Sequence, residues 1–209
     1  MPLRTHVKIC GITKTEDALA AVNYGADALG FVFYDESPRF LDIKSAVNIF
    51  NEIPPFINKV ALFVNADTDY IHAALDELSI DILQFHGDED EAFCSSFHKP
   101  YLKAIRMRDT TNLNQVVDMY GSASGLLLDA FDSSQYGGTG QTFNWDLVPK
   151  QCDLPIVLAG GLNVHNVYDA ITNTDSFAVD ISSGVEKSKG VKDHQLIKQF
   201  MHEVKRANE

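Results

Sequence analysis

Eight short runs of Val, Ile, Leu and Phe recur along the chain, and each is followed by a turn signal and then by a helical pattern of apolar positions. The runs are nearly continuous in apolar character, which is typical of parallel strands covered by helices. The distance in sequence from one run to the next matches the length of one strand plus one returning helix. The predicted strands lie at about residues 6–9, 28–33, 59–64, 80–85, 101–106, 125–128, 155–159 and 177–180.

Helical periodicity fills most of the intervals between these runs. In the first interval, Thr13 and Glu16 have the spacing of a capping box, and Gly25 is a helix stop signal. Asp67 and Asn163 have side chains suited to N-caps of two later helices. The later predicted helices lie at residues 45–52, 67–78, 89–97, 113–120, 165–172 and 193–206, whereas residues 130–153 read mostly as loop.

This alternation predicts an α/β fold, and eight such units close most economically into a single (β/α)8 TIM barrel. An open, doubly wound sheet is the alternative. That fold is expected to have a glycine-rich G-x-G-x-x-G loop after its first strand, whereas residues 10–15 read Cys-Gly-Ile-Thr-Lys-Thr. No linker, charge run or low-complexity segment divides the chain, so we expect one domain over residues 1–209.

Composition and charge narrow the range of partners. The chain has 17 Lys and Arg against 29 Asp and Glu, a formal net charge of −12, and no basic stripe, which argues against nucleic acid as a partner. The three cysteines are odd in number and far apart, as expected for reduced thiols in a cytoplasmic protein. No apolar stretch approaches the roughly 18 residues that span a bilayer, so we expect no membrane contact.

In a TIM barrel the residues that follow each strand meet on one rim, where active sites lie. Cys10 follows the first predicted strand and Asp129 follows the sixth, so a thiol and a carboxyl group are expected on this rim. Taken alone, Cys10 reads more simply as a buried small hydrophobe. Asp129 alone reads also as a helix cap or a loop carboxylate.

The loops after the seventh and eighth strands commonly hold a phosphate in such barrels, through glycine N–H groups and serine hydroxyls. Gly160 and Gly161 follow the seventh run, and the eighth is followed by Ser182, Ser183 and Gly184. The Gly-Gly pair alone reads as readily as a tight turn. Together, the two loops favour a phosphate site.

Seven segments in order add a more specific signal: residues 8–13, 37–39, 84–87, 128–129, 137–140, 159–162 and 179–186. Over essentially its whole length the chain resembles the phosphoribosylanthranilate isomerase family through these segments. The resemblance implies a (β/α)8 barrel that converts N-(5'-phosphoribosyl)anthranilate to the 1-amino-1-deoxyribulose phosphate by an Amadori rearrangement. It also implies a small phosphosugar substrate and no metal or organic cofactor.

The resemblance implies roles for the site residues. The reaction needs a proton at the furanose ring oxygen and removal of a proton from C2', and by resemblance Asp129 is the general acid and Cys10 the general base. Arg39 is expected to bind the anthranilate carboxylate through its planar guanidinium fork. The phosphate is expected at Gly160, Gly161, Ser182, Ser183 and Gly184.

Three further residues belong to the expected substrate-binding set, each with a structural alternative. Lys8 lies on the same strand face as Cys10, where it would stabilise a thiolate or serve as a structural lysine. His86 would line the pocket or hold the loop after the fourth strand. Asp180 would orient the ribose hydroxyls or support the rim. Arg39, in turn, would otherwise be a surface arginine in a turn.

Two other segments invite interpretation. The acidic run at residues 88–91 invites a metal site, but acidic residues at a helix N-terminus complement the helix dipole without any ion. The glycine-rich residues 137–140 lack the Gly-Lys-Ser/Thr sequence of a P-loop, and a mobile lid over the substrate is the more physical interpretation.

Two alternative functions stay open at this point. Another phosphosugar barrel enzyme, such as an indole-glycerol-phosphate synthase or a ribulose-phosphate epimerase, would share the phosphate loops but not the pair of Cys10 and Asp129. A non-catalytic barrel descended from an enzyme would show no turnover. The oligomeric state, a monomer or a homodimer, is not determined by the sequence.

Overall fold

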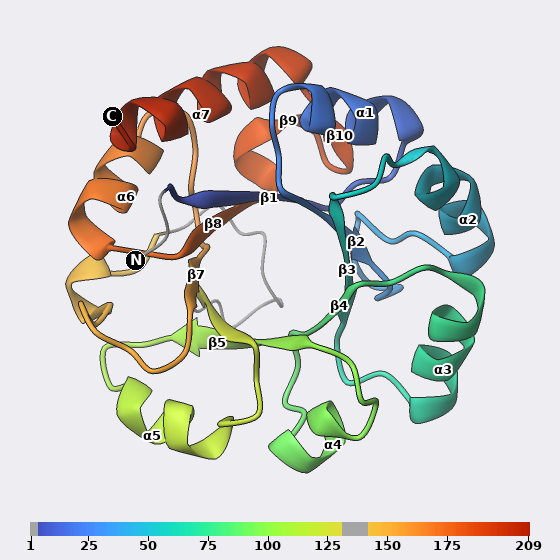
Figure 1. Cartoon of the computed structure of the whole chain (residues 1–209), viewed down its shortest axis with the longest axis horizontal. Helices are drawn as coiled ribbons and strands as arrows, with labels where there is room; N and C mark the ends of the chain where they lie inside the picture. Colours follow the sequence, from blue (N-terminus) through green and yellow to red (C-terminus); the bar gives the residue numbers. More distant parts are fainter. Residues whose placement is uncertain (1–3, 131–141) are drawn as a thin grey trace.

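The structure, a computed structural model, describes residues 4–130 and 142–209. Eight parallel strands pair in chain order, and the last pairs with the first, so that they form a closed barrel. Figure 1 looks down this barrel and shows the helices arranged outside the ring of strands. The TIM barrel predicted from the apolar pattern is confirmed.

The strands and helices lie close to their predicted positions. The strands are β1 His6–Cys10, β2 Ala28–Val32, β3 Asn58–Phe63, β4 Ile82–Phe85, β5 Tyr101–Met107, β6 Gly125–Ala130, β7 Ile156–Leu158 and β8 Ala178–Ile181. The α-helices are α1 Thr15–Asn23, α2 Ile43–Glu52, α3 Thr68–Glu77, α4 Glu91–Ser95, α5 Leu113–Met119, α6 Val167–Thr174 and α7 His194–Ala207. In the described part of the long loop before β7, a 3-10 turn at Trp145–Leu147 is the regular element.

Alternation along each strand separates two apolar layers. In β4, Phe85 points outward and stacks with Phe97 and edge-on with Phe93, both at 5.9 Å between ring centroids. Gln84 lies on the opposite face, inside the barrel, and is fully buried. The residues of the inner apolar cluster are Ala104, Leu127, Val157, Ala159 and Ala178.

Two helix starts differ from the sequence prediction. The Thr13 hydroxyl donates to the carbonyl of Gly190 instead of capping α1, which begins at Thr15 after Lys14. Asn163 precedes α6 by a full turn, since its side chain accepts from the backbone of His165 and the N-cap is Asn166. In both cases the side chain has a loop partner that competes with the capping bond.

Helix α4 is shorter than the predicted helix at residues 89–97. Asp90 is its N-cap and accepts a hydrogen bond from the backbone of Phe93. Glu89 turns inward, where its carboxylate forms a buried ion pair with Lys103 at 2.8 Å. The acidic run is therefore divided between a helix cap and a buried ion pair, and the described residues contain no cluster suited to a metal ion.

A short hairpin between β8 and α7 does not appear in the sequence prediction. Its antiparallel strands are β9 Glu186–Ser188 and β10 Val191–Lys192. The buried Asp17 of α1 accepts from the backbone N–H of Lys192 and lies 2.8 Å from Nε2 of His194, so it joins the first helix to the hairpin and to α7. His194 is thus a partner of a buried carboxylate.

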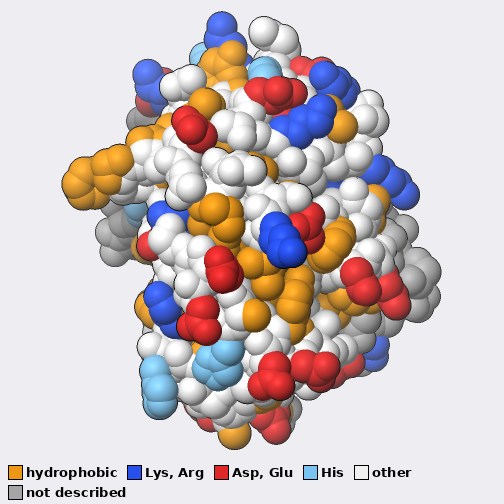
Figure 2. All heavy atoms as spheres, turned by 90° about the vertical axis from the view of Figure 1, so that its right-hand side faces the viewer, with side chains coloured by type: hydrophobic (Ala, Val, Ile, Leu, Met, Phe, Trp, Pro, Cys, Tyr) orange, Lys and Arg blue, Asp and Glu red, His pale blue; other side chains and the backbone are white. Residues whose placement is uncertain are grey.

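The outer surface agrees with the acidic composition. Figure 2 shows the face that carries α2 and α3, where acidic and basic side chains are interspersed with apolar ones and no basic stripe is visible. Among the described residues, no helix has the length and apolar character needed to cross a membrane.

Candidate active site

The carboxyl ends of the strands bring the expected residues to one mouth of the barrel. Cys10 is the last residue of β1, and Asp129 is the penultimate residue of β6. Both are buried, with 5% and 6% of their surfaces exposed. Their inward orientation follows from strand parity, because Lys8 and Leu127, two residues earlier, also face the interior.

Cys10 lies beside a buried ion pair. The ammonium of Lys8 is 2.9 Å from Oδ1 of Asp180, at the end of the adjacent strand β8. Gly30 on β2 makes room for this group, since a Cβ there would lie 2.8 Å from the Cys10 sulfur and 3.0 Å from the Lys8 Cε. Lys8 and Asp180 are thus part of the site, and their mutual contact supports the rim as well.

The electrostatic balance at Cys10 favours the thiol. Burial raises the pKa of Cys10, the nearby ammonium groups of Lys8 and Lys192 act in the opposite direction, and Asp180 raises the pKa further. Burial by itself lowers the pKa of Lys8, but Asp180 and Cys10 raise it overall. The expectation that Lys8 favours a thiolate is therefore consistent with its position, although burial outweighs it.

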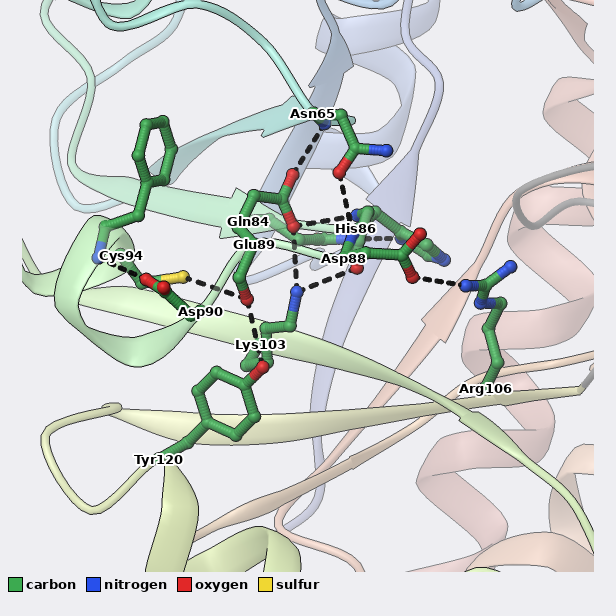
Figure 3. Close-up of polar contacts among 12 residues, drawn as sticks. Asn65, Gln84, His86, Asp88, Glu89, Asp90, Cys94, Lys103, Arg106 and Tyr120 are labelled. Carbon is green, nitrogen blue, oxygen red and sulfur yellow. Dashed lines mark hydrogen bonds and ion pairs between the residues drawn. The ribbon is translucent and has the colours of Figure 1, made fainter.

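Asp129 faces a histidine and an amide. Its Oδ1 accepts the N–H of Ala130 at 2.9 Å, and its Oδ2 lies 3.3 Å from Nε2 of His86, which follows β4. The other ring nitrogen of His86 is 3.0 Å from Nε2 of Gln84, drawn in Figure 3. His86 follows β4 and Asp129 lies on β6, so the two side chains meet across the intervening strand β5.

Arg39 is buried, not a surface residue, and it already has a carboxylate partner. Its Nε and Nη2 donate to the two oxygens of Glu186 at 2.8 and 2.9 Å. Lys192 donates to the same carboxylate at 2.9 Å and to the carbonyl of Ser182 at 3.1 Å. Two cations against one carboxylate leave this buried cluster with one net positive charge, which favours an anionic ligand.

The same cluster explains two pKa shifts. Burial opposes ionisation of Glu186, but the hydrogen bond from Arg39 and the charge of Lys192 lower its pKa overall. For Lys192, burial dominates and lowers the pKa of the ammonium, although Glu186 acts in the opposite direction. The carboxylate is thus held ionised between two cations.

The two glycine-containing loops lie against each other and beside Asp129. Gly160 and Gly161 have φ of +79° and +63°, and a Cβ on Gly160 would lie 3.1 Å from Oδ1 of Asp129. A Cβ on Gly184 would collide with the carbonyl of Leu162, so the loops after β7 and β8 touch at this point. Side chains of two asparagines donate to the carbonyl of Gly161, at 3.0 and 3.1 Å.

The serines of the second loop differ in their surroundings. Ser182 is engaged by Lys192 through its carbonyl and, at 3.4 Å, through its hydroxyl. Ser183 begins the 3-10 turn Ser183–Val185. Within the described ranges, the N–H groups of Gly160 and Gly161 donate no hydrogen bond.

Three side chains of the site had no role in the sequence analysis: Gln84, Glu186 and Lys192. Gln84 was detectable, because it is a polar residue at an inward position of an apolar strand, two residues before His86. Glu186 and Lys192 are placed by the unpredicted hairpin. The expected lid at residues 137–140 lies outside the described residues.

Comparison with known proteins adds the family. Residues 7–203 match the family model described as N-(5'phosphoribosyl)anthranilate (PRA) isomerase. The chain is 50% identical over 198 residues to the N-(5'-phosphoribosyl)anthranilate isomerase of Pseudomonas fluorescens (strain Pf0-1), which covers 95% of this chain and 97% of the relative.

Solved structures agree with this comparison. The crystal structure of phosphoribosyl anthranilate isomerase from Thermotoga maritima has a TM-score of 0.89 and 38% identity, covering 97% of this chain and 99% of that one. A second crystal structure, of the isomerase in complex with reduced 1-(o-carboxyphenylamino)-1-deoxyribulose 5-phosphate, has a TM-score of 0.86 and 36% identity, with the same coverage. The chain belongs to the N-(5'-phosphoribosyl)anthranilate isomerase family.

Proposed function

We propose that this chain isomerises N-(5'-phosphoribosyl)anthranilate to 1-(o-carboxyphenylamino)-1-deoxyribulose 5-phosphate, with Asp129 as general acid and Cys10 as general base. Membership of an aldose–ketose isomerase family supports the reaction. The observation that carries the assignment of roles is the pairing of one buried carboxyl and one buried thiol at the same barrel mouth, with His86 beside the carboxyl and Lys8 beside the thiol.

The chemical steps require only these two groups. Asp129 gives its proton to the furanose ring oxygen as the C1'–O bond breaks, and the nitrogen lone pair forms the C=N bond of a protonated Schiff base. The Cys10 thiolate then removes the proton from C2'. The electron pair of that C–H bond forms the C1'=C2' bond of an enolamine, while the π pair of the C=N bond returns to nitrogen. Tautomerisation of this enol to the ketone completes the rearrangement.

The positive cluster supports a position for the anthranilate carboxylate. Arg39 uses Nε and Nη2 for Glu186, and its remaining Nη1 donates no hydrogen bond within the part of the chain that the structure describes. A ligand carboxylate at this edge would meet the one net positive charge of the cluster. We infer that Arg39 binds the carboxylate through this free edge and that Glu186 holds the guanidinium in place.

The glycine loops support a position for the phosphate. Gly160 lies against Asp129, and Gly184 of the second loop passes the carbonyl of Leu162 in the first. A phosphosugar bound there would bring its ring toward the carboxyl of Asp129. The substrate is thus a small phosphosugar with two anionic groups, a phosphate and a carboxylate. The single domain at residues 1–209 is proposed to act as a monomer or homodimer.

The experiment follows the loss of substrate fluorescence with purified protein. Cys10→Ser and Asp129→Asn are expected to lower kcat by at least ~10²-fold, because a serine hydroxyl is too weak a base and an amide has no proton to give. Cys152→Ser, at a half-buried cysteine outside the barrel mouth, is the control and should match the parent. Turnover by either active-site variant within threefold of the parent would remove that residue from the mechanism, and absence of turnover in the parent would favour a non-catalytic barrel.

A further inference from the structure

Gln84 is the one fully buried amide in the described barrel interior, and its side chain points at a ring that faces the proposed acid. Its Nε2 lies 3.0 Å from Nδ1 of His86, and on the other side of the ring Nε2 lies 3.3 Å from Oδ2 of Asp129. The second contact lacks hydrogen-bond geometry in this structure, and catalytic hydrogen bonds are often poorly aligned until substrate binds. The three side chains form a row from the barrel interior to the carboxyl group.

The orientation of the amide determines which ring nitrogen has the proton. An amide NH2 that donates to Nδ1 requires Nδ1 to be a bare acceptor, so the proton of the neutral ring sits on Nε2. The proton then lies on the ring nitrogen nearer Asp129, whose Oδ2 is 3.3 Å away. The reverse amide orientation would place the proton on Nδ1 and a bare nitrogen opposite the carboxyl oxygen.

A second set of contacts holds His86 in position. Glu89 accepts the backbone N–H groups of Gly87 and Asn65 at 2.9 and 2.7 Å, and Lys103 donates to the carbonyl of Gly87 at 2.8 Å. Figure 3 shows these bonds around the turn that follows β4. Because both side chains of the Glu89–Lys103 pair are about 3% exposed, the turn is fixed by buried, charge-assisted bonds and His86 cannot easily swing away.

We propose that Gln84 is a positioning residue that keeps His86 in the Nε2–H tautomer, so that His86 donates to Oδ2 of Asp129 and stabilises the carboxylate formed when the acid has given up its proton. This inference rests on the proposed role of Asp129. The proton that leaves Asp129 goes to the furanose oxygen, and His86 keeps its own proton throughout. An acid whose conjugate base is stabilised in this way releases its proton more readily in the transition state.

The tautomer can be measured without any turnover. In protein labelled with 15N at its seven histidines, two-bond proton–nitrogen correlations distinguish Nδ1–H from Nε2–H rings, and the His86→Asn variant assigns the His86 signals. We expect the neutral His86 ring to be protonated on Nε2 in the parent protein. In Gln84→Glu, where the carboxylate can only accept, we expect the proton on Nδ1. An Nδ1–H ring in the parent would overturn the inference, whatever the variants do.

Kinetics supply the second measurement. Gln84→Met has a similar length and no hydrogen-bonding group, so it should fold in the apolar barrel interior and lower kcat about tenfold or more, with KM changed less than threefold. Gln84→Glu should lower kcat at least as much. The control, Gln199→Met, replaces an exposed glutamine of α7 and should match the parent.

The outcomes separate this inference from the proposed function. If Gln84→Met keeps kcat within twofold of the parent, Gln84 has no positioning role, even though Asp129→Asn remains inactive. If kcat and KM change together with a lower folded fraction, the residue is merely structural and the inference fails. If the Asp129→Asn variant keeps normal turnover, the assignment of Asp129 as the acid fails instead. The tautomer of His86 then still shows whether the Gln84 amide donates to Nδ1.

Discussion

At the scale of single residues, the unexpected feature is the charge environment of Cys10. A base must be deprotonated to act, yet burial raises the pKa of this thiol above its ordinary value of 9.0 and the cations beside it compensate only in part. At neutral pH Cys10 is therefore mostly in the thiol form. The fraction of Cys10 in the thiolate form increases as pH rises, and the rate of any reaction that needs the thiolate increases with it.

The pH dependence of Cys10 alkylation tests this balance. Because the folded pKa is raised, the rate of modification by iodoacetamide should keep increasing from pH 7 through pH 9 without a plateau. Lys8→Met removes the nearest cation and should slow the reaction at any pH in this range. Peptide mass mapping locates the label, and Cys94, whose burial raises its pKa to about 12, should stay unlabelled. A plateau of the alkylation rate below pH 8 would contradict a raised pKa for Cys10.

Arg39 allows binding to be separated from chemistry. Arg39→Ala should mainly raise KM, by roughly 10-fold or more, since a charge-assisted hydrogen bond contributes about 1.5–3 kcal/mol. Steady-state kinetics on the fluorescent substrate measure both constants, and Arg206→Ala, at the exposed end of α7, is the control. A collapse of kcat at constant KM would show that Arg39 does something other than hold the carboxylate.

At the scale of elements, the loops after β7 and β8 function as a pair because they touch. The contact is made where Gly184 passes the carbonyl of Leu162, with no room for a side chain between them. Any atom added there must move one loop, together with the N–H groups proposed to hold the phosphate. The proposed phosphate site is therefore more sensitive to the distance between the two loops than to their amino-acid composition.

Gly184→Ala tests this contact. The methyl group should push the loops apart and raise KM about tenfold, with a smaller effect on kcat, because the phosphate is remote from the bonds that change. Inorganic phosphate should also become a weaker competitive inhibitor. Gly121→Ala is the matched control, since a Cβ there meets nothing closer than 3.9 Å. An unchanged KM for Gly184→Ala would exclude these loops as the phosphate site.

At the scale of the whole molecule, the closure of the barrel is strengthened outside the sheet. Asp17, on the first helix and 1% exposed, accepts from the backbone of Lys192 and contacts His194 at the start of the last helix. These two contacts join residues that are 175 and 177 positions apart in the sequence. They also fix the hairpin that brings Glu186 and Lys192 to the active site, so closure and site geometry are linked.

Asp17→Ala should lower the free energy of unfolding by about 1–3 kcal/mol, because it leaves a buried N–H group without an acceptor. Urea denaturation followed by circular dichroism measures the change. Asp118→Ala, at an exposed position of α5, should change stability by less than about 0.5 kcal/mol. Equal stability of the two variants would mean that the Asp17 contacts do not contribute to closure.

The sequence determined the architecture and the location of the site. Apolar strands alternating with helical patterns specify a parallel sheet with a helical cover, and this periodicity is visible in one dimension. The ends of those strands then place Cys10 and Asp129 at the same mouth of the barrel. The predicted boundaries were wrong where a polar side chain had a loop partner, as at Thr13 and Asn163.

Only the tertiary structure decided which side chains meet. Lys8 and Asp180 are 172 residues apart and Arg39 and Glu186 are 147 apart, and no local pattern encodes such pairs. The row of Gln84, His86 and Asp129 likewise depends on two strands that are separated by a third. Local periodicity determines which face of an element is buried, whereas the partner that a buried polar group finds depends on how the barrel closes, and here that closure determines the electrostatics of the site.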